Sequence, residues 1–141
     1  MATVHNINTT INYDTIQAAI DAPETLDGYT VLVEKGIYYE NVLVIKSILL
    51  IGKDLPILRG GNTSFGFMVL ADSCRIEGFS VLDTRLGMHL SYCVNTSIVN
   101  NYIHNSSRHG IYLNRANSSL LERNFLLECG DGVFIEEGYG N

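Results

Sequence analysis

Apolar and variable residues alternate through the C-terminal half of the chain, and this alternation returns with a fixed period. The segments "LGMHL" (86–90), "HGIYL" (109–113) and "DGVFI" (131–135) each carry a glycine followed by an apolar, a variable and another apolar residue. Their glycines, Gly87, Gly110 and Gly132, are 23 and then 22 positions apart. Alternation of this kind is typical of a β-strand and not of a helix. The pattern therefore predicts one equivalent strand in each of three repeats.

Two other apolar columns keep the same period. Ile76, Ile98 and Leu121 are separated by 22 and 23 positions, and Val81, Ile103 and Leu126 repeat those steps. Between the columns lie clusters of Asn, Ser, Asp and Gly, such as "NRANSS" and "LECGD", which are typical of turns. Each repeat thus predicts three short strands, which cannot bury their own inward face. The repeats must stack, with each strand parallel to its counterpart at roughly 4.8 Å, as a parallel β-helix.

Strand-like segments continue upstream with less regularity. They are "TVLV" (30–33), "NVLVI" (41–45), "SILLIG" (47–52), "PILRG" (56–60) and "FMVL" (67–70). Together with the later repeats they predict an all-β solenoid of about five coils over residues 30–141, within a single domain that spans residues 1–141.

The two ends of this solenoid differ in sequence. Asp14 stands three residues before Gln17, a capping-box spacing, and Ile16, Ala19 and Ile20 share one helical face. An amphipathic helix over about residues 13–22 would close the N-terminal end, as terminal repeats must. After "DGVFIEEGYGN" the sequence stops partway through a coil, leaving an unpaired edge. We expect either the front piece of a longer β-helix or copies that stack end to end.

One polar column has a structural interpretation. Phe79, Asn101 and Asn124 occupy equivalent positions between the second and third strands. Asparagines one coil apart can hydrogen-bond to each other and to the backbone where it leaves its ladder. We expect Asn101 and Asn124 to hold the turn and not a ligand.

The amino-acid composition argues against several classes of partner and site. A net charge of −6 and a pI near 5.0 argue against nucleic acid and anionic membranes. The longest apolar run, residues 42–52, is too short to cross a bilayer and contains Lys46. The three cysteines, Cys74, Cys93 and Cys129, show no CxxC spacing, so we expect packing residues or free thiols and neither a disulfide framework nor a zinc site.

The N-terminus and the asparagines bear on export. The opening "MATVHNINTT" lacks the basic and apolar regions of a secretory signal. Asn-x-Ser/Thr sequons begin at Asn8, Asn62, Asn95, Asn105 and Asn117. These suit an exported protein, although a chain rich in Asn, Ser and Thr also forms such triplets by chance.

The segment from "YDTIQAAIDA" to "SILLIG" (13–52) and the repeats "CRIEGFSVLDTRLGMHL" and "SIVNNYIHNSSRHGIYL" resemble right-handed parallel β-helix proteins of the pectate-lyase-like superfamily. The repeats are similar to carbohydrate-binding and sugar-hydrolysis repeats, including those of NosD-type periplasmic proteins. The resemblance covers nearly the whole chain and implies an extracellular, cell-surface or periplasmic location. Because the superfamily spans lyases, hydrolases, epimerases and noncatalytic surface proteins, it indicates the fold more sharply than the activity.

The resemblance also implies where a ligand would lie, since polysaccharide in this superfamily usually follows the outside of the glycine-containing strand. Carried over column by column, the outward positions are Val69, His89, Tyr112 and Phe134. The turn before the strand supplies Arg85, Arg108, His109 and Asp131, and the turn after it supplies Tyr92, Asn114, Arg115, Glu136 and Glu137. Aromatic rings would stack on sugars while arginines reach hydroxyls or uronates. The alternative is that His89, Tyr112 and Phe134 form an exterior ladder that stacks on itself.

Catalytic relatives place carboxylates on adjacent coils, to hold calcium beside an arginine base or to act as an acid–base pair. The outward positions contain no carboxylate, which leaves Arg108, Asp131 and Asp83 as candidates. Asp83 and Asp131 lie in turns two coils apart, about 10 Å if they align, but their offsets from the repeat glycine differ.

The four histidines include no close pair of metal ligands, although His104 and His109 could approach across one turn. We therefore expect no metal and no cofactor, with calcium as an option only if the protein is a lyase.

These observations favour a noncatalytic carbohydrate-interacting or structural surface module, with glycan bound by His89, Tyr112, Phe134, Arg85, His109 and Arg115. The alternatives are a polysaccharide lyase, epimerase or glycoside hydrolase, complete or truncated, and a scaffold that assembles as a homo-oligomer through its C-terminal coil.

Overall fold

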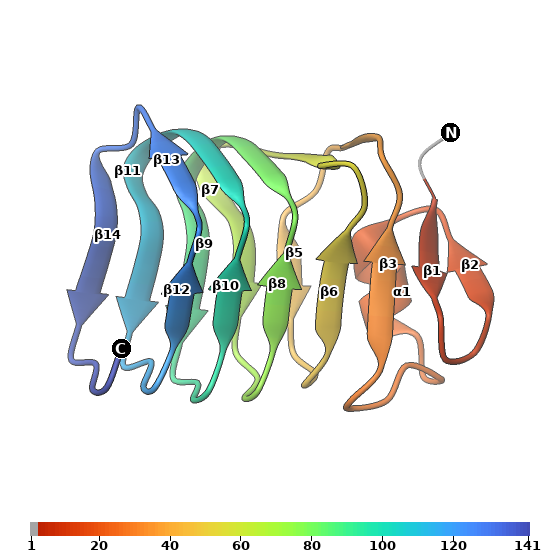
Figure 1. Ribbon diagram of the computed structural model, residues 1–141. Helices are drawn as coiled ribbons and strands as arrows, with labels where there is room; N and C mark the ends of the chain where they lie inside the picture. The colour runs from red at the N-terminus through yellow and green to blue at the C-terminus, as the bar shows by residue number, and fades with distance from the viewer. Residues whose placement is uncertain (1–2) are drawn as a thin grey trace.

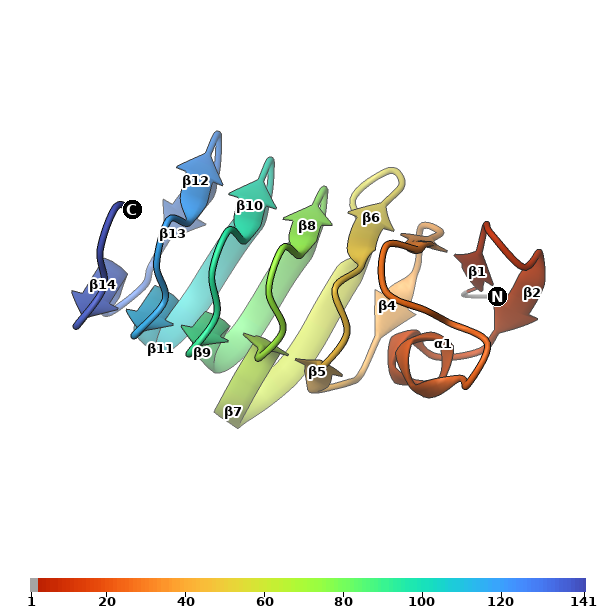
Figure 2. The same cartoon turned by 90° about the horizontal axis from the view of Figure 1, so that it is seen from below.

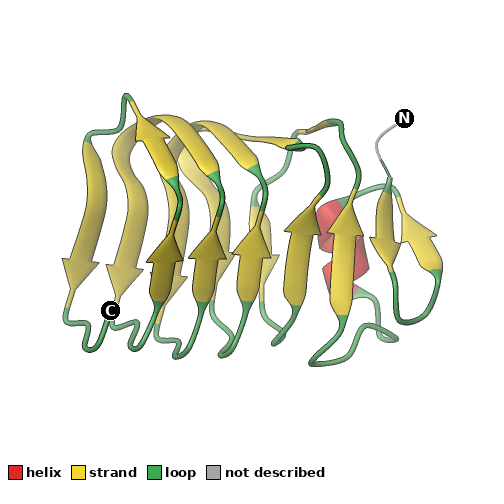
Figure 3. Cartoon of the chain, viewed as in Figure 1, coloured by secondary structure: helices red, strands yellow, loops and turns green. Residues whose placement is uncertain are grey.

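The computed structural model describes residues 3–141, apart from the side chains of residues 62 and 63. The chain winds as a right-handed parallel β-helix, which rises through one sheet and descends through a second before it advances by one coil (Figure 1). Most of each coil is strand, joined by short loops (Figure 3). The predicted all-β solenoid with an N-terminal helix is confirmed.

Five coils carry the strands in a repeating order. The first sheet receives one parallel strand from each coil: β3 (Thr30–Val33), β6 (Leu49–Gly52), β8 (Arg75–Glu77), β10 (Ser97–Val99) and β12 (Leu120–Glu122). The second sheet contains β4 (Ile37–Tyr38), β5 (Val42–Val44), β7 (Ile57–Val69), β9 (Ser80–Ser91), β11 (Tyr102–Asn114), β13 (Phe125–Leu127) and β14 (Asp131–Glu136). The first and last coils have three separate strands, as predicted. In the three middle coils the second and third strands run on as one long strand.

Neighbouring coils pair in the predicted register. Ile98 lies opposite Ile76 on one side and Leu121 on the other, and the column through Ile103 is paired in the same way. Alternate residues therefore point inward at one level after another. The inward residues of the middle coils are fully buried, so the predicted core is confirmed.

Coil length is less regular upstream. Thr30 pairs with Leu49 and Leu49 with Arg75, steps of 19 and 26 positions by subtraction. The later steps, from Arg75 to Ser97 and on to Leu120, are 22 and 23. Between Leu49 and Ile57 the long coil has three more residues than the next coil has between Arg75 and Ser80, and it has two more in the bend of β7, where the register with β9 shifts. The turn before β7 and the bend within it absorb the differences in length while the flanking columns stay aligned.

Each coil turns at corners where the backbone is left-handed. One corner column contains Ser73, Asn95 and Ser118, with φ of 55°, 55° and 53°. Left-handed backbone is uncommon outside glycine, and Asn tolerates it better than most residues. The Asn- and Ser-rich turn segments of the sequence are therefore explained by the corners that they form.

The repeat glycine is required by close packing between coils. A Cβ on Gly110 would lie 2.4 Å from Leu126 Cδ2 and 2.8 Å from Gly132 O, and one on Gly87 would lie 2.5 Å from Gly110 O. Gly87 and Gly110 are not among the glycines with positive φ. The column is thus glycine because no other residue leaves room for the neighbouring coil.

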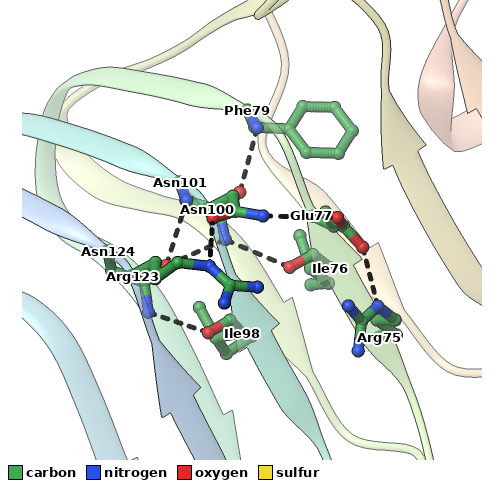
Figure 4. Close-up of polar contacts among 9 residues, drawn as sticks. All are labelled: Arg75, Ile76, Glu77, Phe79, Ile98, Asn100, Asn101, Arg123 and Asn124. Atoms are coloured by element: carbon green, nitrogen blue, oxygen red, sulfur yellow. Dashed lines mark hydrogen bonds and ion pairs between the residues drawn. The ribbon is translucent and has the colours of Figure 1, made fainter.

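The asparagine column forms a hydrogen-bonded ladder (Figure 4). The Oδ1 atom of Asn101 accepts from the Phe79 N–H at 2.9 Å, and its Nδ2 donates to Ile76 O at 3.1 Å. Asn124 repeats this one coil later, accepting from the Asn101 N–H at 3.1 Å and donating to Ile98 O at 2.8 Å. The structural role predicted for these asparagines is confirmed.

The N-terminal end is covered by α1 (Ile16–Asp21) and by the antiparallel strands β1 (Val4–Asn6) and β2 (Ile11–Tyr13) (Figure 2). Ile16, Ala19 and Ile20 face the interior and are fully buried. The N-cap is Thr15, whose side chain accepts from the Ala18 N–H, so the capping box predicted from Asp14 was wrong.

The Gln17 side chain does not reach back to the start of the helix, because it bonds to a neighbouring strand. Its amide nitrogen, Nε2, donates to Leu43 O at 3.0 Å, and its Oε1 accepts from the Leu43 N–H at 2.7 Å. One side-chain amide thereby satisfies both backbone groups of Leu43 on β5, as a neighbouring strand would. The helix closes the edge of the sheet as well as the interior.

The last coil is open in the described part of the chain. Val133 and Ile135 point toward the interior but are 45% and 47% exposed, whereas Ile111 and Leu113, one coil earlier, are fully buried. The strands β12, β13 and β14 each have one free edge in residues 3–141. No helix among those residues has the length and apolar character needed to cross a membrane.

Candidate functional site

One row of side chains follows the outer face of the repeated strand. Tyr112 lies opposite His89 in the coil before it and opposite Phe134 in the coil after it. Before these, Met68 lies opposite His89. Val69 is fully buried, so its predicted place in this row was wrong. We call Met68, His89, Tyr112 and Phe134 the outer row.

The sequence contained a signal for Met68. Phe67 pairs with Met88, so Gly66 occupies the same column as Gly87. In each of these coils the outward residue follows the glycine by two positions. Counting from Gly66 identifies Met68, whereas the apolar pattern of "FMVL" alone does not separate inward from outward residues.

The rings of the outer row stack along the axis of the solenoid. The centroids of His89 and Tyr112 are 4.6 Å apart, with planes inclined by 20°. Tyr112 and Phe134 are 5.8 Å apart and tilted by 47°. Each ring therefore turns a face to its neighbour, in the ladder arrangement common to cross-strand pairs. Phe134, on the last strand, is 41% exposed.

His109 completes this cluster as a fourth ring. It is not in a turn, as the sequence indicated, but within β11, where it is only 5% exposed. Its ring stacks on Phe134 at 4.7 Å, with planes inclined by 9°. Its Nδ1 lies 2.9 Å from Asp131 Oδ2, close enough for an ion pair, although the N–H is not directed at the oxygen as in a hydrogen bond. His109 therefore packs beneath the row.

His89 carries unsatisfied polar atoms. Both ring nitrogens are buried, and neither has a hydrogen-bond partner among the described residues. Burial lowers the pKa of this imidazole below its ordinary value. At neutral pH His89 therefore acts as an uncharged ring beneath Tyr112.

Tyr112 has a polar outer end. Its hydroxyl donates to Glu136 Oε2. This hydrogen bond, together with partial burial and the negative charge of Glu136, raises the pKa of Tyr112, against the opposing effect of the Arg108 charge. The Tyr112 hydroxyl and the Glu136 carboxylate thus lie in contact beside the aromatic stack.

Arg85 and Arg108 occupy neighbouring coils at the bend before the outer row, and both are exposed. Within residues 3–141, no carboxylate lies within 4.0 Å of either guanidinium. The other arginines each have such a partner: Arg59, Arg75, Arg115 and Arg123. Among the arginines, these two guanidinia are the ones left available to an external anion.

The corner after the row is held by its own contacts. Arg115 Nε lies 2.5 Å from Glu137 Oε2, its Nη1 donates to the Tyr92 hydroxyl at 3.0 Å, and its guanidinium carbon lies 5.4 Å from the centre of the Tyr92 ring. All three side chains are exposed, so these contacts contribute little to stability. Asn114 precedes this corner, at the end of β11, and is half-buried.

The candidate carboxylates do not face each other. Asp131 lies opposite His109, whereas Asp83 is in a different column, held by Arg59 at 2.5 Å and by Asn105 Nδ2 at 2.8 Å. The two aspartates therefore form no acid–base pair across a shared bond.

The histidines are also separated. His104 is paired with Glu128 at 2.9 Å, and His5 with Asn12 and Glu34. No three His, Cys, Asp or Glu side chains gather in a metal-binding arrangement among residues 3–141. No two of the four histidines are brought to one site with a third ligand.

Comparison with known proteins places this geometry in a family. Residues 7–141 match the family described as periplasmic copper-binding protein (NosD). A cell surface glycoprotein of Methanothermus fervidus is 34% identical over 106 residues, which cover 74% of this chain and 18% of that protein. This chain thus corresponds to about a fifth of the length of that relative. No solved structure is significantly similar.

The family description implies copper, and the described residues do not fit it. Copper sites are built from clustered His, Cys or Met ligands. Burial raises the pKa of the Cys74 thiol to about 11 and also raises the pKa of Cys93, which disfavours the thiolate form that a metal binds. With the histidines dispersed as well, this part of the chain offers no copper-binding set.

Proposed function

Because this chain belongs to the NosD family, we propose that it is a noncatalytic β-helix module of a surface or exported protein, which binds glycan along the outer row. The observation that carries the proposal is that Arg85 and Arg108, exposed on neighbouring coils at the bend before the outer row, have no carboxylate partner among the described residues. The glycan that suits them is acidic.

The arrangement favours recognition through hydrogen bonds and ion pairs. The faces of His89 and Tyr112 are turned to one another, so a sugar meets their edges. Arg85 and Arg108 would bind uronate or sulfate groups, charge-assisted contacts that are among the stronger ones available to a surface. The Tyr112 hydroxyl and Glu136 would contact sugar hydroxyls, and the exposed ring of Phe134 would cover one pyranose face.

The carboxylates near the row support binding rather than turnover. Asp83, Asp131, Glu136 and Glu137 are each engaged by a neighbouring side chain. A general acid needs a carboxyl of raised pKa aimed at the scissile bond. None of these four is so placed toward a partner carboxylate.

Binding of oligogalacturonate, a neutral glucan oligomer and a sulfated glycan, measured by calorimetry at low and moderate salt, tests the proposal. The double variant Arg85→Ala, Arg108→Ala should weaken acidic glycan binding by roughly tenfold or more, since charge-assisted hydrogen bonds contribute about 1.5–3 kcal/mol. Arg123→Ala is the matched control, because Arg123 is exposed on another sheet and ion-paired with Glu122. Equal binding by both variants, or no binding of any acidic glycan by the unaltered protein, would contradict the proposal.

A second candidate is end-to-end assembly, favoured by the apolar edge of the last coil. Phe125, Val133 and Ile135 are 56%, 45% and 47% exposed there, beside unpaired strand edges that favour strand addition. Light scattering across a concentration series tests it. Self-association that Val133→Lys abolishes would support a scaffold, and a monomer at all concentrations would contradict it.

A further inference from the structure

We propose that Asn95 is a site of N-linked glycosylation, selected by the fold from the four sequons whose asparagine side chains the structure describes. This goes beyond glycan recognition, because it concerns sugar attached to the chain itself. The sequence places sequons at Asn8, Asn62, Asn95, Asn105 and Asn117, and the structure separates them by what each amide does. The side chain of Asn62 lies outside the described residues.

Three of the asparagine amides are already occupied. Asn8 Oδ1 accepts from the Thr30 N–H at 2.9 Å, and Asn117 Oδ1 accepts from the Tyr139 N–H at 2.8 Å. Asn105 Nδ2 donates to Asp83 Oδ1 at 2.8 Å. Modification of Asn105 would require the bond at its Nδ2 to break. The bonds at Oδ1 hold the amides of Asn8 and Asn117 against the backbone, so turning either amide into a transferase active site would also break a hydrogen bond.

Asn95 differs from them in its contacts. It is exposed, and its side-chain amide forms no hydrogen bond within the described part of the chain. It lies at the corner column with left-handed backbone, where its neighbours one coil away are Ser73 and Ser118. Both serines are exposed and small, so the space on either side of the Asn95 amide is open.

The other two residues of this sequon also favour modification at Asn95. Thr96 is fully buried, whereas Ser97, the hydroxyl residue at the third position, is partly exposed. Asn95 and Ser97 are therefore both accessible from outside while the residue between them anchors the corner. By contrast, the third residue of the Asn117 sequon, Ser119, is only 6% exposed.

The reaction is a glycosyl transfer from a polyprenyl phosphate or pyrophosphate carrying an oligosaccharide. The bond from Asn95 Nδ2 to the anomeric carbon forms, and the bond from that carbon to the phosphate oxygen breaks. The lipid phosphate leaves with the bonding electrons, and the amide loses one proton to a base of the transferase. Nothing is oxidised or reduced.

The test treats the folded chain with an oligosaccharyltransferase that accepts Asn-x-Ser/Thr and a lipid-linked oligosaccharide, followed by peptide mapping in a mass spectrometer. Synthetic peptides spanning the same sequons measure modification without the fold. We expect Asn95 to be modified in the folded chain, with about tenfold lower occupancy at Asn8, Asn105 and Asn117, as when a hydrogen bond must open first. The peptides should not show this preference.

Two variants sharpen the result. Ser97→Ala keeps the asparagine but removes the sequon, and should abolish the added mass on the peptide that contains Asn95, while Ser107→Ala, in the Asn105 sequon, should leave the mass on that peptide unchanged. Modification of the Asn95 peptide but not of Asn95 in the folded chain would overturn the proposal. Equal occupancy at all four asparagines of the folded chain would overturn it as well.

Discussion

Both ends of the solenoid have an apolar cross-section. It is covered by a helix at the N-terminal end and exposed at the C-terminal end of the described chain. At the N-terminal end, Ile16 and Ile20 of α1 lie over the interior and are fully buried. At the C-terminal end, Val133 and Ile135 occupy equivalent inward positions and are about half exposed. The second sheet ends at one side against Gln17, which bonds both backbone groups of Leu43, and at the other in the open strand β14.

The difference shows that covering a β-helix involves two separate tasks. The apolar interior must be shielded from water, and the backbone groups of the edge strand need partners. The helix α1 does both: one of its faces shields the interior from water, and one of its side-chain amides bonds the backbone of the edge strand. The last described coil has neither provision, so the contribution of its inward residues depends on whatever covers them.

The largest expected effect compares the same residue type at the two ends. Ile16→Ala should lower the free energy of unfolding by about 2–4 kcal/mol, because it opens a cavity under the cap. Ile135→Ala should cost less than about 1 kcal/mol, because water already reaches much of that side chain. Urea denaturation of both variants measures the contrast. Equal losses would mean that the last coil is covered in solution, and Ile16→Val provides a milder variant if the alanine form does not fold.

The asparagine ladder extends the comparison to polar groups. Asn101→Ala should cost about 2–3 kcal/mol, because it strands the Phe79 N–H and the Ile76 carbonyl inside the protein. Asn124→Ala should cost about 1 kcal/mol, since water can reach the last coil and replace part of what is lost. The same denaturation measurement ranks them. A larger loss for Asn124 would contradict an ordering set by burial.

The edge function of Gln17 can be examined at a single amide. Gln17→Leu should remove the acceptor of the Leu43 N–H and speed its hydrogen exchange by about tenfold, as expected for one lost hydrogen bond. Gln17→Glu keeps that acceptor but turns its second oxygen toward the Leu43 carbonyl, so it should restore only part of the protection of the Leu43 amide. If both variants exchange alike, the protection comes from helix packing and not from the amide.

The smallest expected effect is on the pH dependence of stability, and it arises from His89, which lies between the two ends of the solenoid. Burial lowers the pKa of His89 in the folded protein below its ordinary value of 6.5. The unfolded chain therefore binds a proton more readily, so stability is present above pH 6.5 and falls as the pH drops below it. His89→Phe should lose less stability than the unaltered protein between pH 7.5 and pH 5.5, measured by thermal unfolding. An identical pH dependence would show that His89 does not titrate differently on folding.

Much of the fold could be predicted because the constraint repeats. The columns through Ile98 and Ile103 recur at one period, and each occurrence supports the others. The irregular coils lack this redundancy, which is why β4 and the hairpin of β1 and β2 were missed and Val69 was placed on the wrong face. The capping box failed because Glu40 accepts from the Gln17 N–H and the Gln17 side chain bonds Leu43, contacts across 23 and 26 positions that no local spacing contains.

The candidate site was less predictable, for a physical reason. The sequence locates the outer row but not the orientation of its rings, which depends on how each packs on the next. His109 could not be recognised as a buried ring because the register shift in β11 moves it out of the turn. The unpaired state of Arg85 and Arg108 is likewise a property of their surroundings, set by carboxylates in other coils that pair with other arginines.

The asparagine ladder also determines the order in which the coils can be completed while the chain is synthesised. Asn101 bonds to Phe79 and Ile76, and Asn124 bonds to Asn101 and Ile98, so each asparagine completes the coil made before its own. A chain that leaves the ribosome from its N-terminus therefore presents each of these coils with unpaired backbone until the following coil has emerged. The helix α1 precedes the first described coil in the chain, and each described coil then serves as the template for the one that is synthesised after it.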